Sequence, residues 1–489
     1  MTDDAFDLLI RAGRLFCADS QFDEPGAVAI RDGRMVAAGA DVEGSARRTL
    51  EFPTGVLLPG LIDLHAHPAK SGSVFGVEPD EFMLRRGTTT VGSQGDAGAD
   101  NWQTYHAETI EQSQTRVLLA MNLSRVGEST EAGCLECLDD ADVDACVSAI
   151  ESAGESVWAI AVNVSHNACG ESDPREVLQR GLTAAAATGL PLLFGMRRPE
   201  DWPLAAQLER LRPGDVVTYC FRREPHCIVS DCRVLPEVRE ARKRGILFDV
   251  GHGTGSFDFD VAATAIANGF PPDTISTDLQ RRHIGMLPQH DLPLTMSKLH
   301  AAGMPMADVF TAVTHAAATA LGRPQLGTLA AGTEADLTVL AWDETIGPLS
   351  DSSGKSRNGG EWSVLLTVRG GAIVEELRVE GAEWRDGEAR RKPARQRGPG
   401  APGVVVVIGG GACANAVNRE QLGGAPRVLA GHHVGPGQHV ERAQRDVSGV
   451  ADRGRHDIEP RRQFTWSGGG ATLAVPSPVL GVGPWHRFR

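Results

Sequence analysis

The segment that decides the fold reads Pro59-Gly60-Leu61-Ile62-Asp63-Leu64-His65-Ala66-His67. Its apolar run predicts a short buried strand that ends at the two histidines. Side chains two residues apart on a strand point to the same face, so His65 and His67 are expected to lie side by side. Two imidazoles in that arrangement can each give a nitrogen to one metal ion. An isolated His-x-His is a weak indication of a metal site, and its surroundings in the chain decide what it means.

Around this segment, short apolar strands alternate with helical stretches over about 260 residues, which is the length and pattern of a (β/α)₈ barrel. The predicted strands cover residues 56–64, 88–91, 157–164, 190–194, 216–220, 246–250 and 274–276. The predicted helices include 145–152, 174–188, 202–211, 233–244 and 258–268. The predicted fold class is therefore α/β, a (β/α)₈ TIM barrel. A doubly wound sheet is the structural alternative, but two β-rich ends do not normally flank such a sheet. Catalytic residues of barrels lie at the C-terminal ends of strands, where His65 and His67 fall.

The two ends of the barrel region differ from it in pattern. Residues 1–58 and 326–390 contain short strands and turns, and neither part can bury both of its faces alone. We expect them to form one composite β-sandwich beside a barrel of residues 59–325. Residues 391–489 are rich in glycine and arginine without a period, which is typical of a low-complexity tail. One further hypothesis is that this tail is an out-of-frame extension of a shorter protein, so its deletion is expected to leave folding and activity intact.

Composition narrows the classes of partner. The chain has 48 Lys and Arg against 63 Asp and Glu, a formal net charge of −15. This balance argues against nucleic acid or an anionic membrane surface as the main partner. No apolar run approaches the roughly 18 residues of a membrane span, and the acidic N-terminus is unlike a signal peptide, so we expect a cytoplasmic protein. The nine scattered cysteines indicate reduced thiols, and the isolated Cys-x-x-Cys of Cys134 and Cys137 is interpreted as incidental.

Several phrases together resemble the amidohydrolase superfamily of metal-dependent hydrolases over roughly residues 7–345. They are Pro59–His67, Gly87–Val91, Ser276-Thr277-Asp278-Leu279, Gly327–Leu329 and Gly332–Leu337. The phrases Phe248–Gly253 and Thr295–Lys298 look most like its deacetylase and dihydroorotase-like branch. The resemblance implies a barrel with a small β-sandwich built from both chain ends. It also implies hydrolysis of an amide or ester bond in a small-molecule substrate.

The resemblance further implies a metal site. His65, His67 and Asp278 match the residues that hold one divalent ion, for which we expect Zn²⁺, and Asp278 matches the general base that takes a proton from water. The carboxylated lysine and two histidines that hold a second ion in the family are absent. Their places are taken by Ala161, a strand containing Phe194 and a strand containing Tyr219, so we expect one metal ion. Asp96 can supply another ligand oxygen, although an aspartate beside glycine is more often a turn residue.

Other side chains are candidates for substrate contact. Pairs of arginines follow three predicted strands closely and can bind a carboxylate or phosphate of the substrate, whereas the alternative is solvated loop charge. The candidates for substrate binding are His252, Tyr219, Arg197, Arg222 and Arg282. Whether His166, His226 or His252 replaces a missing metal ligand is left open by the sequence.

We therefore predict a metallohydrolase with one divalent ion and a small substrate, for which the arginine pairs allow an anionic group. Two other classes remain. Loss of ligand positions is also what a catalytically degenerate barrel would show, serving as a binding or assembly subunit. A changed pocket can also run a different reaction, such as isomerisation, decarboxylation or deamination. Substrate identity and oligomeric state, a homo-oligomer included, are not determined by the sequence.

Overall fold

The computed structural model describes residues 5–198, 201–224 and 227–376. Its centre is a parallel sheet of seven strands in the order β13-β10-β9-β8-β7-β6-β5. These strands are β5 (Leu61–Ala66), β6 (Thr88–Ser93), β7 (Arg116–Asn122), β8 (Val157–Asn163), β9 (Leu192–Gly195), β10 (Val216–Thr218) and β13 (Leu247–Phe248). Apart from the step from β10 to β13, each strand pairs with the next one in sequence, which is the order of a (β/α)₈ barrel. The predicted α/β fold class is confirmed.

The eighth position of the barrel is taken by residues 274–279, which form too irregular a segment to count as a strand. On one side the amide nitrogen of Val250 donates to the carbonyl oxygen of Thr274 at 3.2 Å. On the other side the amide nitrogen of Asp278 donates to the carbonyl oxygen of His65 at 2.7 Å. Asp278 itself has a φ of +50°, which regular strand geometry does not allow. The segment nevertheless joins β13 to β5 and closes the barrel.

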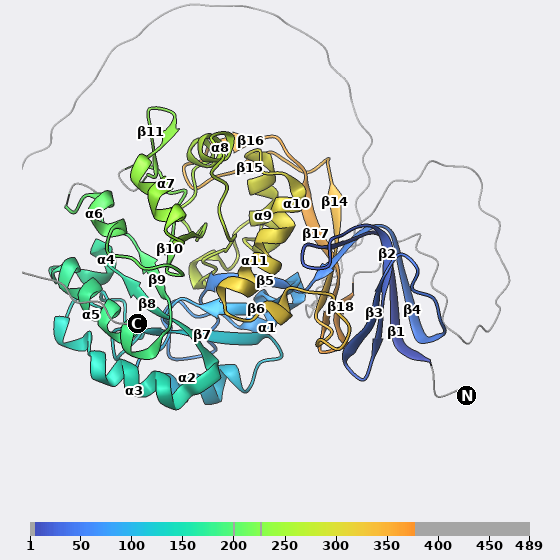
Figure 1. Ribbon diagram of the computed structural model, residues 1–489, viewed down its shortest axis with the longest axis horizontal. Coiled ribbons are helices and arrows are strands. Elements are labelled where there is room, and N and C mark those ends of the chain that lie inside the picture. Colours follow the sequence, from blue (N-terminus) through green and yellow to red (C-terminus); the bar gives the residue numbers. More distant parts are fainter. Residues whose placement is uncertain (1–4, 199–200, 225–226, 377–489) are drawn as a thin grey trace, which may run out of the picture. The chain divides into compact units, whose positions relative to one another are not determined.

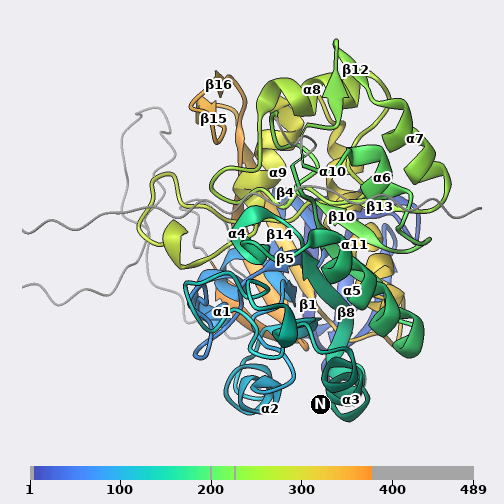
Figure 2. The ribbon, with the colours of Figure 1, turned by 90° about the vertical axis from the view of Figure 1, so that its left-hand side faces the viewer.

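Helices surround the strands (Figure 2). They are α1 (Pro79–Phe82), α2 (Trp102–Tyr105), α3 (Val143–Ala153), α4 (His166–Cys169), α5 (Pro174–Thr188), α6 (Leu204–Leu208), α7 (Pro236–Lys243), α8 (Phe259–Ala267), α9 (Leu292–Ala301), α10 (Met306–Ala312) and α11 (His315–Ala320). Local signals explain the bounds of α5, because Asp173 caps its first turn, Pro174 begins it and Gly189 ends it at a φ of +73°. In the part of the chain described here, no helix is both long and apolar enough to cross a membrane.

Two helices are shorter than the sequence predicts. The helix expected over 202–211 is only Leu204–Leu208, and the one expected over 233–244 begins at Pro236. Arg233 and Val234 form β12 instead, paired with β11 (Val229–Ser230). Proline is favoured in the first turn of a helix, so Pro236 marks the start of α7 better than apolar periodicity does.

The strands from the two chain ends form one mixed sheet with the order β18-β17-β14-β4-β1-β2-β3. Its members are β1 (Phe6–Cys17), β2 (Phe22–Arg31), β3 (Arg34–Gly39), β4 (Ala46–Pro59), β14 (Leu337–Asp343), β17 (Glu361–Arg369) and β18 (Ala372–Glu376). The N-terminal and C-terminal parts meet where β4 pairs with β14, and the dark-blue and orange strands lie side by side in Figure 1. A further pair, β15 (Leu349–Ser350) and β16 (Ser356–Arg357), lies outside this sheet. The domain limits stay a prediction, and residues 391–489 lie outside the described residues.

Strand β7 is missing from the strands expected from the sequence. Its seven residues, Arg-Val-Leu-Leu-Ala-Met-Asn, form an apolar run in which all but the first residue are buried. Such a run does not alternate, because barrel strands are covered on both faces, and periodicity alone cannot separate it from a buried helix. The omission matters for function, since the loop after β7 contributes to the pocket described below.

Candidate metal centre

Three side chains converge at the C-terminal end of β5. The Nε2 atoms of His65 and His67 lie 3.5 and 3.2 Å from the same oxygen, Oδ1 of Asp278. Ligand atoms at tetrahedral angles around one zinc ion, each 2.0–2.1 Å from it, lie roughly 3.3 Å apart. Two imidazole nitrogens and one carboxylate oxygen therefore fit a divalent ion with an open position. Within the described ranges, these three residues are the only such group of three or more with potential ligand atoms within 4.8 Å of one another.

Hydrogen bonds on the far sides of the rings orient both imidazoles. His67 Nδ1 lies 3.0 Å from Oδ1 of Asp96, and His65 Nδ1 lies 2.7 Å from Oγ1 of Thr218. The Thr218 hydroxyl donates in turn to Asp249 at 2.9 Å, so it accepts from His65. Both Nδ1 atoms therefore carry a proton, and both Nε2 atoms, on the side of Asp278, are the ones available to a metal ion. Such outer hydrogen bonds are typical of histidines that bind a metal.

Asp96 lies behind His67 in this arrangement, on the side of the ring away from Asp278. Its two carboxylate oxygens accept from the hydroxyls of Ser73 and Ser93, each at 2.6 Å. The carboxylate is thereby held against Nδ1 of His67. This position is that of a group that orients a ligand, whereas the sequence analysis considers Asp96 as a ligand itself.

Asp249 is a site residue that sequence reasoning misses. It is fully buried and accepts hydrogen bonds from the hydroxyls of Thr218, Thr274 and Ser276. These hydroxyls come from β10 and the eighth segment, the two neighbours of β13. The Asp249 carboxylate therefore links both neighbours by hydrogen bonds beside the candidate metal site. A signal exists in the sequence, because an acidic residue in the apolar phrase Phe248–Val250 needs buried partners.

The charges of the site fit the binding of a cation. Burial alone would lower the pKa of His65, but the nearby carboxylates of Asp249 and Asp278 raise it to about 8. Burial would raise the pKa of Asp278, but the hydrogen bonds from His65 and His67 hold it well below its usual range. In the absence of a metal ion these histidines therefore retain protons, which a divalent cation displaces when it binds.

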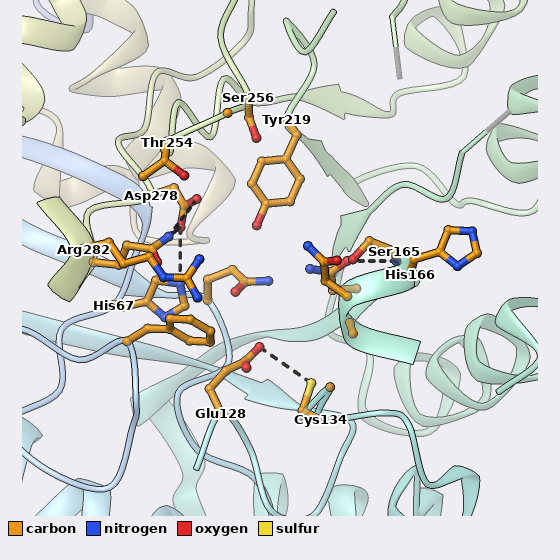
Figure 3. A pocket seen from close by; sticks show the side chains of 18 of the residues that line it. His67, Glu128, Cys134, Ser165, His166, Tyr219, Thr254, Ser256, Asp278 and Arg282 are labelled. Carbon is orange, nitrogen blue, oxygen red and sulfur yellow. Dashed lines mark hydrogen bonds and ion pairs between the residues drawn. The ribbon is translucent and has the colours of Figure 1, made fainter. Parts of the chain in front are cut away.

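Two of the three candidate ligands, His67 and Asp278, line a pocket of about 540 Å³ (Figure 3). Tyr219 reaches into it directly after β10, and its hydroxyl oxygen lies 3.4 Å from Nε2 of His65. The backbone of Tyr219 has a φ of +67°, a strained conformation for an aromatic residue. The guanidinium of Arg222 lies over the Tyr219 ring, 4.5 Å from its centre. Also lining the pocket are Phe75, Gln94, Glu128, Cys134, Asn163, Ser165, His166, Arg198, Ser256, Gln280 and Arg282.

The predicted arginines are divided between two environments. Arg222 and Arg282 line the pocket. Arg197 is buried away from it, with Nε 3.2 Å from Asp201 and Nη1 3.5 Å from the carbonyl oxygen of Val164. Arg198, its neighbour in the chain, lines the pocket in its place. The sequence places the pair in a loop after β9, but only the backbone path decides which member faces the site.

The candidate histidines also lie in different environments. His252 is buried outside the pocket lining, where Nδ1 donates to the carbonyl oxygen of Gly253 at 2.8 Å and Nε2 lies 3.1 Å from Nζ of Lys298. His166 lines the pocket and bonds to Asp201. His226 lies outside the described residues. Ala161 and Phe194 are buried in apolar clusters and do not line the pocket.

Comparison with known proteins agrees with this geometry. The profile of the Amidohydrolase family matches residues 93–374. A deacetylase from Enterococcus faecalis is 30% identical over 378 residues, 76% of this chain and 99% of the relative. A deacetylase from Agrobacterium fabrum is 31% identical over 327 residues, 66% of this chain and 80% of the relative. A solved adenine deaminase structure has a TM-score of 0.69 at 29% identity and covers 75% of this chain and 99% of its own. A solved dihydroorotase structure has a TM-score of 0.67 at 29% identity and covers 75% of this chain and 98% of its own.

Proposed function

This chain belongs to the amidohydrolase family of metal-dependent hydrolases, and from that premise we propose that it cleaves an amide or ester bond in a small, anionic molecule with the help of one divalent ion. The observation that carries the proposal is the convergence of His65 Nε2, His67 Nε2 and Asp278 Oδ1, of which His67 and Asp278 line a pocket. The similarity to two deacetylases supports a substrate in which an acyl group is removed by water. We propose the cytoplasm as the compartment in which the enzyme acts.

The chemistry can be divided among the side chains. A divalent ion held by His65, His67 and Asp278, for which we propose zinc, would supply Lewis acidity and lower the pKa of water to about 7. Asp278 then receives the proton of the attacking water as general base. The hydroxyl of Tyr219 donates a hydrogen bond to the carbonyl oxygen of the substrate as negative charge develops there. Burial raises the pKa of Tyr219 well above its usual range, which keeps the hydroxyl a neutral donor.

Arg222 supports the choice of an anionic substrate. Its Nη2 and Nε atoms donate to the hydroxyl of Ser256 at 2.8 and 3.2 Å. In the described part of the chain, no carboxylate oxygen is recorded within 4 Å of its guanidinium. Burial lowers the pKa of Arg222, so an anion from outside the protein would relieve the desolvated charge. The predicted consequence is that Arg222→Met raises KM for an anionic substrate far more than for its neutral analogue, whereas Arg223→Met, at an exposed site outside the pocket lining, changes neither.

The test of the proposed function begins with the metal content of the purified full chain. We expect one ion per chain. A chelator should remove both the ion and the activity against a panel of small amides and esters, and adding the ion back should restore that activity. The double variant His65→Asn/His67→Asn is the control and should bind no ion. Two ions per chain would overturn the single-metal assignment. No ion and no turnover would favour a degenerate binding or assembly subunit, and turnover confined to deamination or isomerisation substrates would overturn hydrolysis.

A further inference from the structure

Glu128 is a pocket residue to which neither the sequence motifs nor the metal site assigns a role. It lies in the loop after β7, and its side chain enters the pocket from the wall opposite Tyr219 (Figure 3). The loop is held firmly, because the amide nitrogen of Val74 donates to the carbonyl oxygen of Glu128 at 2.9 Å. The preceding Gly127 has a φ of +58°, and a Cβ there would lie 2.7 Å from Cα of Ala97. The side chain is 9% exposed, so what it faces is the pocket rather than bulk solvent.

The environment of Glu128 is unusual for an acidic side chain. Its one recorded side-chain partner is the thiol of Cys134, with Sγ 3.6 Å from Oε1, and a thiol is a weak donor. In the ranges that the structure covers, no lysine, arginine or histidine nitrogen is recorded within 4 Å of its oxygens. A carboxylate buried without a cation loses hydration that nothing replaces, so the protonated form is favoured.

The groups around Glu128 reinforce this preference. Burial, the largest cause, raises its pKa, and so do the carboxylates of Asp96 after β6 and Asp278 in the eighth segment. His67 after β5 and the Cys134 thiol lower it, and the resulting pKa is about 7. Across the pocket Tyr219 is a neutral phenol at these pH values, and the other titratable or charged side chains of the lining are Glu131, His166, Arg198, Arg222 and Arg282. Near neutral pH a substantial fraction of Glu128 therefore carries a proton, as a general acid requires.

We propose that Glu128 is the general acid that protonates the leaving group of the substrate, an assignment that rests on the hydrolase function proposed above. Water adds to the carbonyl carbon and its proton passes to Asp278. When the tetrahedral adduct collapses, the bond from carbon to the leaving nitrogen or oxygen breaks, and its electron pair remains on the leaving atom. That atom takes the proton of the Glu128 carboxyl. Asp278 then releases its proton to solvent and Glu128 takes one up, so the cycle consumes only water.

The placement of the two carboxyl groups gives each a separate task. Asp278 lies with the histidines on the side where water is activated, whereas Glu128 comes from a different barrel loop on another wall. A substrate bound between them would present its carbonyl to Tyr219 and its leaving atom to Glu128. Division of acid and base between two carboxyl groups in different environments is a recurring arrangement in hydrolases.

The experiment compares an alkylamide and a 4-nitrophenyl ester that carry the same acyl group. Nitrophenolate can leave without being protonated, whereas an amine leaving group must receive a proton. For Glu128→Gln we expect kcat/KM for the amide to fall by about 10²–10⁴-fold, while the ester changes by less than about 3-fold. The alkaline limb of the amide pH profile, with an apparent pKa near 7 in the parent enzyme, should disappear in the variant. Glu128→Asp, which keeps a carboxyl, should recover part of the amide activity.

The matched control is Glu136→Gln, which changes an exposed glutamate eight residues away, outside the pocket lining, and should leave both substrates unaffected. Metal content and thermal midpoint of Glu128→Gln are measured to show that it folds. An infrared titration adds a readout without turnover: the carboxyl C=O band that titrates near pH 7 should weaken in Glu128→Gln. Equal losses on both substrates, or an unchanged amide rate, would overturn the assignment. Failure of the parent enzyme on every amide and ester would instead overturn the proposed function.

Discussion

Tyr219 directly follows β10, the strand on which the family resemblance leads us to expect a lost ligand of a second ion. Its ring is edge-on to His65, with the ring centres 5.1 Å apart, and its hydroxyl reaches the space in front of the metal ligands. A phenol that donates a hydrogen bond to a carbonyl oxygen can take over part of the polarising role of a second cation. The donor role that we propose for Tyr219 would compensate in part for a missing second ion.

Tyr219→Phe therefore tests the role of the hydroxyl. We expect kcat to fall by about 10²–10³-fold, because one donor to the developing oxyanion is removed, with metal content unchanged. The chain has only two tyrosines, and the other supplies the control: Tyr105 donates to the carbonyl oxygen of Pro68 at 2.7 Å outside the pocket lining. Tyr105→Phe should reduce stability by about 1–3 kcal/mol and leave kcat within a few-fold. Similar kcat losses in both variants would contradict the proposed role.

Asp96→Asn separates an orienting carboxylate from a metal ligand. Because Asp96 contacts Nδ1 of His67 and not the face shared with Asp278, the variant should still bind one ion, with an affinity about 10–100-fold weaker. Isothermal titration with zinc measures this change. Asp100→Asn, at an exposed carboxylate paired with Arg125, is the control and should bind zinc as the parent does. Complete loss of binding in Asp96→Asn would identify Asp96 as a ligand.

The element that shapes the site is the segment after β13, which contains two glycines at φ +49°, Gly251 and Gly253. A Cβ on Gly253 would lie 2.4 Å from Oδ2 of Asp278, and one on Gly251 would lie 2.3 Å from Oγ1 of Thr218. The backbone can therefore approach both the ligand carboxylate and the hydroxyl that orients His65 only where side chains are absent.

Gly253→Ala is predicted to displace Asp278. The methyl group meets the carboxylate, and the left-handed backbone adds about 1–2 kcal/mol of strain, so metal affinity and turnover should both fall by at least about 10-fold. Gly255→Ala is the matched control, since a Cβ at Gly255 has no atom within 4 Å. Zinc titration of the two variants checks the prediction. An unchanged affinity in Gly253→Ala would show that the loop can yield without moving the ligand.

At the scale of the whole molecule, the barrel buries a group of histidines that form no ion pair with a carboxylate among the described residues. His283 stacks on His290 with ring centres 4.1 Å apart, and His290 in turn lies 4.8 Å from His252. Burial lowers the pKa values of all three histidines, that of His290 to about 3. The folded protein therefore keeps them neutral at pH values where the unfolded chain binds protons.

This difference makes the protein sensitive to acid. Because the pKa of His290 is lower in the folded than in the unfolded state, its contribution to stability is present above about pH 6.5 and is lost progressively as the pH falls towards 3. His290→Gln keeps a donor for the carbonyl oxygen of Thr277, which His290 Nε2 contacts at 2.8 Å. Between pH 6 and 4 we expect the unfolding free energy of this variant to change less with pH than that of the parent. The difference between the two slopes should be up to about 1.4 kcal/mol per pH unit. Urea unfolding at several pH values measures the slope, and parallel slopes would contradict the prediction.

What the sequence by itself determined is local or periodic. The period of two on a strand places His65 and His67 together, the βα repeats set the fold class, and the family phrases indicate Asp278 as the third ligand. What only the tertiary structure decided depends on contacts between distant segments. Thr218 meets His65 across 153 residues, Arg198 faces the pocket and Arg197 does not, and Glu128 enters from a loop whose strand carries no alternating pattern. The physical reason is that periodicity fixes which face a side chain occupies, whereas the register of the closed barrel and the path of its loops decide which faces meet.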